Sequence, residues 1–419
     1  MPRNLFNFFT RFRKSARPQV ATTSQTVAPM QMGMTLQIPS QGISTSGNQF
    51  LDSQGNPVRL TGFVTVSNYY ALTPPNQVTY TLADYQAMVA LGANYQSIRI
   101  SAASLGFGTG DTPDALFLAA LDNMVALAKQ VGMATSIKMT TYSIPAFAPT
   151  NKNATWTDFW NGVALNGNPL SMMDEWVACW KTLWTRYLSE PAVIGYDLLN
   201  EPMVGNLGVS NGVFVASYVN PYYISTISTM RTFTNDNKKI AFFQPPVISG
   251  STAYMNYFIS LGITHNIAFA GHFYPNAGAY ITTGSTATDK YAPYLTQYLA
   301  NAATSGVPLI IGEYGNPWDP ANDGNTTKQA QFRTMELKAM NSFTAAGLSF
   351  SRPWYANDNA AVTVEIGQIP TPSVLDWSLR EGTTDLSGPL RTWITDIFTG
   401  GVASYGTPST PLGMLGVGQ

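Results

Sequence analysis

Short apolar runs alternate with amphipathic segments over most of the chain, from about residue 59 to residue 355. Each run has the near-continuous apolar character of a strand that is buried on both faces of a parallel sheet. The runs predicted as strands are Arg59–Val66, Tyr95–Ser101, Ala134–Tyr142, Val193–Leu199, Lys239–Val247, Ile267–Tyr274, Pro308–Glu313 and Leu348–Tyr355. Eight strands that alternate with helices predict an α/β fold, the closed (β/α)8 TIM barrel, which needs about 250 residues.

Caps and stops mark the helices between these strands. One helix is predicted from Leu82 to Gly92, a second opens at Thr112-Pro113, and a third opens at about Asp174. The third helix carries tryptophans at i+4 spacing, namely Trp176, Trp180 and Trp184. This stripe predicts packing against the sheet rather than contact with a sugar.

The two ends of the chain differ in amino-acid composition from the part between them. Residues 1–17 are basic and rich in phenylalanine, and residues 18–46 carry no charge, so we expect 1–46 to form a head and linker outside the fold. The head is interpreted as a disordered segment, an arm for attachment to a surface or particle, or an organelle address. A β-hairpin is predicted over Gly47–Phe63, the barrel domain over 47–398, and a tail rich in Gly, Pro and Ser over 399–419.

Composition excludes several classes of protein. Charged residues make up only 11% of the 419 residues, against about 25% in an average soluble domain, so neutral polar groups must cover the surface. The net charge of −1 argues against a nucleic-acid partner, because phosphate neutralisation requires a basic excess. The single cysteine, Cys179, excludes an intramolecular disulfide and a cysteine-rich metal site. We predict neither a transmembrane segment nor a clear signal peptide, because no apolar run is long enough.

Polar residues end several of the predicted strands, and the active site of a (β/α)8 barrel lies at these ends. Glu201 follows the fourth strand and Glu313 ends the seventh, although the whole chain has only seven glutamates. Glutamate is almost never buried without a partner, so this placement predicts a functional pair. A pair of carboxylates facing one cavity is what cleavage of a glycosidic bond requires, with one protonated and the other ionised. The other candidates at strand ends are Arg99, Asn200, His272, Tyr274 and Trp354.

Four motifs, in order along the chain, resemble glycoside hydrolase family 5, in the clan of retaining (β/α)8 glycosidases. They are Gly55-Asn56-Pro57-Val58-Arg59-Leu60-Thr61-Gly62, Gly195-Tyr196-Asp197-Leu198-Leu199-Asn200-Glu201-Pro202, His272-Phe273-Tyr274-Pro275 and Gly312-Glu313-Tyr314-Gly315. The similarity runs from about residue 47 to residue 360. It implies that Glu201 is the general acid/base and that Glu313 is the nucleophile.

The same resemblance implies roles for the remaining candidates. Asn200 would hydrogen-bond the sugar 2-hydroxyl, and His272 would help to set the protonation of the acid/base. Arg99 and Tyr274 would hold the nucleophile ionised, although Arg99 is also compatible with a structural ion pair. Trp354 would be the stacking floor of the subsite before the cleaved bond.

The expected activity is hydrolysis of a β-linked polysaccharide, of β-1,4-glucan or β-mannan type, by double displacement through a covalent glycosyl-enzyme. The alternatives are an endoglycoceramidase-like glycolipid hydrolase and a non-catalytic carbohydrate-binding or attachment protein on the same barrel. Many relatives place a histidine after the third strand, where this chain has the run from Lys138 to Tyr142, so the contacts of the donor sugar stay open. We expect no organic cofactor and no metal, since two histidines without a thiol cluster make a poor site, and we expect a monomer that acts outside the cell.

Overall fold

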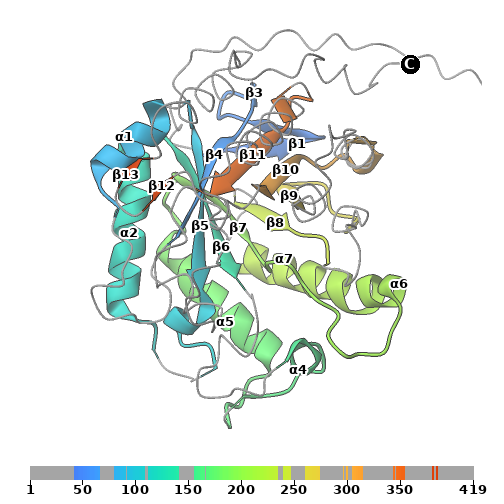
Figure 1. The fold of residues 1–419 in the computed structure, drawn as a ribbon. Helices are drawn as coiled ribbons and strands as arrows, with labels where there is room; N and C mark the ends of the chain where they lie inside the picture. Colours follow the sequence, from blue (N-terminus) through green and yellow to red (C-terminus); the bar gives the residue numbers. More distant parts are fainter. Residues whose placement is uncertain are drawn as a thin grey trace, which may run out of the picture. The chain divides into compact units, whose positions relative to one another are not determined.

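The computed structural model describes residues 42–66, 80–90, 92–108, 112–140, 155–165, 167–234, 239–246, 260–273, 296, 299–300, 304–314, 343–344, 346–353, 380–381 and 384–385. Eight parallel strands close into a barrel in the order β10-β11-β4-β5-β6-β7-β8-β9 (Figure 1). They are β4 (Thr61–Val66), β5 (Tyr95–Ser101), β6 (Ala134–Thr140), β7 (Val193–Asp197), β8 (Ile240–Phe243), β9 (Ile267–Phe273), β10 (Leu309–Tyr314) and β11 (Ser349–Pro353). The predicted (β/α)8 barrel is confirmed.

Two of the strands end before the predicted boundary, and the reason lies in their hydrogen bonds. β7 stops at Asp197 and β8 at Phe243, whereas the apolar runs continue to Leu199 and Val247. After one last backbone bond, from the Leu198 amide to the Phe242 carbonyl, the carbonyls of Leu198 and Leu199 accept from side chains. After β8, the amide of Gln244 likewise donates to a side chain, the Tyr223 hydroxyl. An apolar run therefore predicts burial, but the end of a strand depends on the partner that the next backbone group finds.

The interior of the barrel is layered, because residues in register on neighbouring parallel strands point to the same side. The layer near the amino ends of the strands is apolar and contains the buried side chains Leu60, Tyr95, Ala134, Ile194, Ile240, Ala268 and Ile310. Four residues further along β5 and β6, Arg99 lies in register with Lys138, and Lys138 lies in register with Asp197 of β7. The interior thus changes from apolar to charged toward the carboxyl ends of the strands.

A small antiparallel sheet covers the amino ends of the strands. It consists of β1 (Ser44–Ser46), β2 (Gln49–Leu51) and β3 (Pro57–Val58), and its residue Phe50 packs on Phe242 of the barrel with ring centroids 6.3 Å apart. The Asp52 carboxylate accepts two backbone hydrogen bonds in the turn between β2 and β3, which confirms the predicted hairpin turn. The predicted hairpin extended to Phe63, and this part is wrong, because residues from Thr61 onward belong to the barrel.

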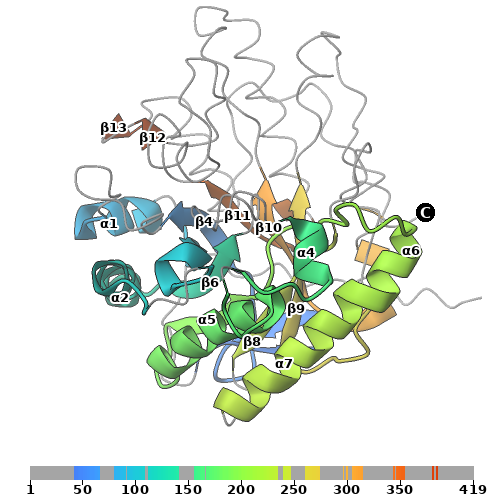
Figure 2. The same ribbon diagram turned by 90° about the horizontal axis from the view of Figure 1, so that it is seen from below.

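Helices pack around the outside of the barrel (Figure 2). They are α1 (Leu82–Ala90), α2 (Ala115–Gln130), α4 (Trp156–Trp160), α5 (Met172–Arg186), α6 (Asn211–Phe214) and α7 (Asn220–Thr234), with a short 3-10 helix η1 (Ala102–Leu105) and a π-helical turn η2 (Val215–Val219). The N-cap of α2 is Asp114, two residues beyond the predicted start, because its carboxylate accepts hydrogen bonds from two amides of the first turn. The tryptophan stripe of α5 is buried against β7, as predicted, with Trp180 5.6 Å from the ring of Tyr196.

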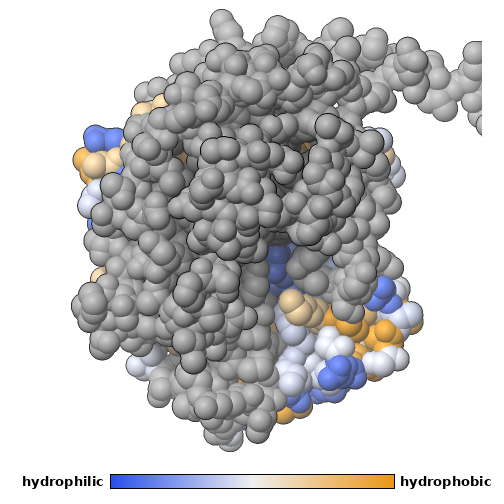
Figure 3. All heavy atoms as spheres, viewed as in Figure 1, coloured by the Kyte–Doolittle hydropathy of each residue, from blue (hydrophilic) through white to orange (hydrophobic). Residues whose placement is uncertain are grey.

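The surface over α6 and α7 mixes apolar and hydrophilic side chains rather than forming one apolar face (Figure 3). Val213 and Ile224 are among the exposed apolar side chains of these helices. The described helices include none that is both long and apolar enough to cross a membrane. Two further strands, β12 (Arg380–Glu381) and β13 (Thr384–Asp385), form a separate antiparallel pair.

Candidate active site

Glu201 lies in the irregular segment that follows β7, at the carboxyl end of the barrel. Its side chain is buried, and its backbone adopts φ of 47°, in the left-handed region that residues other than glycine rarely occupy. The Glu201 amide donates to Gln244 Oε1 at 2.8 Å, and the Glu201 carboxylate Oε1 lies 2.8 Å from His272 Nδ1. The turn therefore directs the carboxylate toward β9.

Glu313 reaches the same region from β10. The pairing of β10 with β9 shifts between Ile311 and Glu313, and such a bulge changes the direction in which the next side chain points. The Ser351 hydroxyl of β11 donates to the Gly312 carbonyl at 2.6 Å, so a side chain satisfies a carbonyl within the irregular pairing. The bulge brings Glu313 into register with His272.

Lys138 forms a buried ion pair with Glu313 across the interior of the barrel. β6 and β10 lie on opposite sides of the closed sheet, and Lys138 Nζ is 2.5 Å from Glu313 Oε1. The exposed fractions of the two side chains are 0% and 4%. Each of these two buried charges needs the other, because removing one partner would leave an uncompensated charge away from water.

His272 lies between the two carboxylates. Its Nδ1 is 2.8 Å from Glu201 Oε1 and 3.7 Å from Glu313 Oε2, and its Nε2 is 3.5 Å from Lys138 Nζ. An ammonium group can only donate, so a neutral imidazole presents its Nε2 lone pair to Lys138 and carries its proton on Nδ1, and an imidazolium has a proton on Nδ1 as well. The imidazole therefore donates to Glu201 rather than accepting from it.

Charges around Glu313 determine its protonation. Burial by itself raises the pKa of Glu313, but the positive charges of His272, Lys138 and Arg99 outweigh burial and hold this pKa well below its ordinary value. Asp197, which lies beside Lys138 in the register, shows the opposite balance. Burial raises the pKa of Asp197, and Lys138, His272 and Gln244 only partly offset it.

Five of the residues predicted from strand ends come together here: Arg99, Asn200, Glu201, His272 and Glu313. Arg99 acts on Glu313 through its charge and pairs in register with Lys138. Asn200 is buried beside Glu201, with Oδ1 3.4 Å from Gln244 Nε2. The other two candidates, Tyr274 and Trp354, lie outside the described residues.

Lys138, Asp197 and Gln244 belong to this cluster, although they were not among the predicted site residues. Gln244 Nε2 donates to Asp197 Oδ2 at 2.7 Å, and both side chains are buried. A lysine in the middle of an apolar strand was the available signal for Lys138, because lysine is almost never fully buried without a partner. Gln244 carried no comparable signal, since it follows a strand whose end the sequence misplaces.

The same cluster has the donor atoms of a metal site. One atom each from Glu201, His272 and Glu313 lies within 4.8 Å of the others, and two carboxylates with an imidazole are a donor set that zinc accepts. The ammonium of Lys138 lies next to Glu313, however, and the charge of Arg99 also acts there, so both cations oppose the binding of a further cation. The arrangement suits proton transfer and nucleophilic attack better than metal binding.

Comparison with known proteins adds a family and several solved structures. The family model for cellulase (glycosyl hydrolase family 5) matches residues 51–359. No curated protein matches the chain.

Three solved structures illustrate the similarity of fold. One is an endogalactoceramidase, 18% identical over 85% of this chain and 84% of that chain, with a TM-score of 0.57. Another is the endo-glycoceramidase II from Rhodococcus sp., 19% identical over 83% and 80% of the two chains, with a TM-score of 0.58. A third is a hyperthermophilic endocellulase from the archaeon Pyrococcus horikoshii, 13% identical over 86% and 99%, with a TM-score of 0.59. At such identities the likeness concerns the fold.

Proposed function

This chain belongs to glycosyl hydrolase family 5, and we propose that it hydrolyses a β-linked polysaccharide by double displacement, with Glu313 as nucleophile and Glu201 as acid/base. The family makes the chain a glycoside hydrolase with a carbohydrate substrate. The observation that carries the two roles is the unequal surroundings of two buried carboxylates. Cations surround Glu313, whereas Glu201 faces the Nδ1–H of an imidazole.

In the first step, Glu313 attacks the anomeric carbon. Its carboxylate must be ionised and must point steadily at one position, and the ion pair with Lys138 supports both requirements. Arg99 adds a second positive charge on the same side. As the new C–O bond forms, the bond from the anomeric carbon to the leaving oxygen breaks, and the negative charge of Glu313 is lost to the ester.

Glu201 supplies the proton that the leaving oxygen takes. His272 donates to Oε1 of Glu201, which leaves Oε2 as the oxygen that carries the proton toward substrate. After the leaving group departs, Glu201 is ionised and accepts a proton from the incoming water, which attacks the anomeric carbon and releases Glu313.

The distance between the carboxylates supports retention of configuration. An oxygen of Glu201 and an oxygen of Glu313 lie within 4.8 Å of each other. Retaining glycosidases hold their carboxyl groups about 5–5.5 Å apart, whereas inverting enzymes leave roughly 6.5–9.5 Å for a water molecule. We therefore favour a covalent glycosyl-enzyme over direct attack by water.

The remaining roles are those that the family resemblance implies. We propose that Asn200 hydrogen-bonds the sugar 2-hydroxyl next to the bond that is cleaved, and that Tyr274 supports the ionised Glu313. Trp354 would stack on the donor sugar, since sugars present apolar C–H faces to aromatic rings.

For the substrate, we propose β-1,4-glucan or β-mannan, and a glycolipid is the second candidate. The endocellulase from Pyrococcus horikoshii is matched over 99% of its length, whereas the endogalactoceramidase and the endo-glycoceramidase II are matched over 84% and 80% of theirs. The sequence identities favour the second candidate instead, at 18% and 19% against 13%. The two substrates differ in the aglycone, so one assay separates them.

The test is release of reducing ends from carboxymethyl cellulose, mannan, xyloglucan, mixed-linkage glucan and a glycosphingolipid. Glu201→Ala and Glu313→Ala should each lose activity by at least about 10³-fold while remaining folded. Glu175→Gln is the matched control, because Glu175 is also a buried glutamate but bonds to Gly108 and Asn168 outside the site. Full activity of Glu313→Ala would overturn the proposed nucleophile, and an inverted anomer seen by proton NMR would overturn double displacement.

A further inference from the structure

The backbone at Glu201 is held in a conformation that its own side chain does not favour. Among the described residues other than glycine, only Glu201 and Asn266 have a positive φ, and both have φ of 47°. A left-handed residue with a Cβ atom persists only where its surroundings determine its conformation. The groups that hold Glu201 therefore bear on the direction of its carboxylate.

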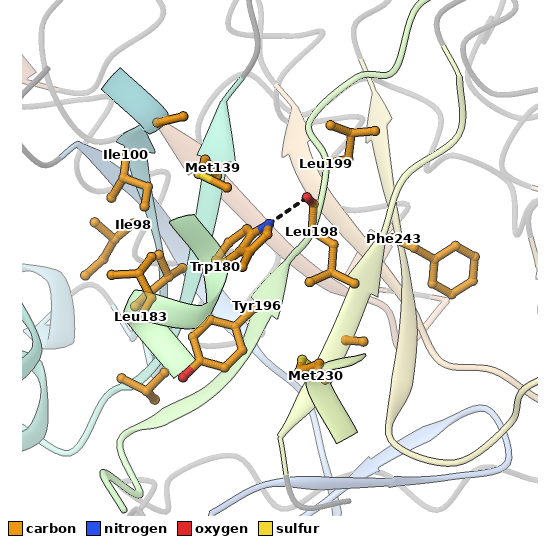
Figure 4. Packing of buried hydrophobic residues seen from close by; sticks show 14 of the residues in the cluster. Ile98, Ile100, Met139, Trp180, Leu183, Tyr196, Leu198, Leu199, Met230 and Phe243 are labelled. Atoms are coloured by element: carbon orange, nitrogen blue, oxygen red, sulfur yellow. Dashed lines mark hydrogen bonds between the residues drawn. The ribbon is translucent and has the colours of Figure 1, made fainter. Parts of the chain in front are cut away.

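Side chains accept or donate most of the backbone hydrogen bonds that the structure shows between β7 and Glu201. The Leu198 carbonyl accepts from the indoles of Trp176 at 3.0 Å and Trp180 at 2.9 Å, and the second of these bonds is drawn in Figure 4. The Leu199 carbonyl lies 3.1 Å from the hydroxyl of Tyr223, which donates to it. The segment that leads to Glu201 keeps one backbone bond to β8, from the Leu198 amide to the Phe242 carbonyl, while its carbonyls are tied to α5 and α7.

Gln244 makes the bond that lies at Glu201 itself. Its Oε1 accepts from the Glu201 amide at 2.8 Å, and its Nε2 donates to Asp197 Oδ2 at 2.7 Å and lies 3.4 Å from Asn200 Oδ1. A carboxylate can only accept, so Asp197 determines which end of the Gln244 amide faces Glu201. Gln244 is fully buried, so water does not replace these bonds.

Tyr223 holds Gln244 in place from α7. The Gln244 amide donates to the Tyr223 hydroxyl at 3.1 Å, and the same hydroxyl lies 3.2 Å from the Gln244 carbonyl. One buried hydroxyl thus contacts both the segment before Glu201 and the backbone of Gln244, and it links the ends of β7 and β8.

We propose that Gln244, oriented by Asp197 and Tyr223, is a positioning residue that keeps the Glu201 backbone left-handed and so aims the acid/base carboxyl at the leaving oxygen. This proposal rests on the proposed function of Glu201. It requires no contact between Gln244 and the substrate. The defect of a Gln244 variant should therefore resemble a weakened general acid rather than a general loss of folding or binding.

The experiment compares Gln244→Met with wild type on two aryl β-cellobiosides, one with a dinitrophenyl and one with a phenyl leaving group. Dinitrophenolate leaves without a proton, whereas phenolate needs one, so a misplaced acid slows only the second substrate. We expect kcat/KM for the phenyl glycoside to fall on the order of 10²-fold and kcat/KM for the dinitrophenyl glycoside to change less than about 3-fold. Equal losses on both substrates would overturn the proposal.

A matched pair of residues elsewhere in the fold, Gln96 of β5 and Tyr85 of α1, controls for lost stability. Gln96 is also fully buried and also pairs with a tyrosine, since the Tyr85 hydroxyl donates to Gln96 Oε1 at 2.9 Å. Gln96→Met should lower stability without changing the ratio of the two rates. If Gln244→Met does not fold, Tyr223→Phe, which removes only the hydroxyl, is compared with Tyr85→Phe by the same two substrates. A selective loss in Tyr223→Phe supports the proposal, and an unselective one overturns it.

Two further measurements separate this inference from the proposed function. Glu201→Ala should show the same selective loss to a greater extent, with azide restoring turnover of the dinitrophenyl glycoside, and its failure to do so would overturn the acid/base role itself. A crystal structure of Gln244→Met, or of Tyr223→Phe, gives a result that does not depend on the sugar chosen. We expect φ of Glu201 to leave the left-handed region. A φ of Glu201 that stays near 47° would overturn the proposed positioning role of Gln244.

Discussion

Replacing Lys138 by methionine removes the cation nearest to the proposed nucleophile while keeping a side chain of similar length. Lys138 Nζ is 2.5 Å from Glu313 Oε1, and both side chains are almost completely buried. At an effective dielectric constant of about 20, unit charges at this distance attract by roughly 7 kcal/mol, and desolvation of both groups offsets a large share. Breaking a buried pair costs about 3–5 kcal/mol. Because the charges of Arg99 and His272 remain, we expect the free energy of unfolding to fall by about 3 kcal/mol near neutral pH.

The pH dependence gives this prediction a sign. The folded-state pKa of Glu313 is depressed, so the stability that Glu313 contributes is present above its unfolded pKa of about 4.3 and is lost as the pH falls through the folded value. In Lys138→Met the folded pKa rises. The deficit in stability should therefore be largest near neutral pH and should shrink as the pH falls between the raised pKa of the variant and the depressed pKa of the wild type. The acidic limb of kcat/KM should move to higher pH, because the nucleophile must be ionised.

The assay is chemical denaturation at a series of pH values together with a pH–rate profile. Lys129→Met is the control, because Lys129 pairs with Glu190 at 3.0 Å on the surface, where the side chains are 52% and 25% exposed. A pair of this kind contributes at most about 1 kcal/mol, and its loss should leave the acidic limb in place. If Lys138→Met loses no more stability than Lys129→Met, and its acidic limb does not move, then Lys138 does not hold Glu313 in its ionised form.

Three further predictions concern the packing of β7 on β8, a shared hydrogen-bond acceptor and the need for a metal. In Gly195→Ala, the added Cβ would lie 2.1 Å from the Ile240 carbonyl oxygen, so we expect a loss of at least about 3 kcal/mol in thermal or chemical unfolding, and wild-type stability would contradict the packing at β7 and β8. Trp180→Phe removes one of two indole donors to the Leu198 carbonyl, and Trp176 still donates there. The lost hydrogen bond should therefore lower the free energy of unfolding, measured by chemical denaturation, by only about 1 kcal/mol. Dialysis against EDTA should leave kcat/KM unchanged, because the proposed chemistry uses side chains alone, and a loss that zinc restores would indicate a metal-dependent reaction instead.

The amino-acid sequence predicted most of the barrel and the pair of glutamates, because both can be recognised from short stretches of neighbouring residues. Each apolar run is bounded by turn residues, and Glu201 and Glu313 stand out as acids at the ends of such runs. The ends of β7 and β8 were predicted less well. Leu198 and Leu199 are as apolar as the strand before them, and the Leu198 amide still donates to the Phe242 carbonyl of β8. The carbonyls of Leu198 and Leu199 and the amide of Glu201, however, bond to the side chains of Trp176, Trp180, Tyr223 and Gln244.

The sequence by itself thus determined the order of the strands, the closed barrel that follows from them, and the two carboxylates at its mouth, since periodicity and strand ends are properties of neighbouring residues. Only the tertiary structure decided which charges meet there. Lys138 and Glu313 are 175 residues apart in the chain, and they form an ion pair because β6 and β10 face each other once the sheet has closed. Gln244 meets Glu201 for a similar reason, since β7 and β8 are neighbours in the sheet. Contacts of this kind depend on strand number, register and bulges together, and no local pattern specifies that combination.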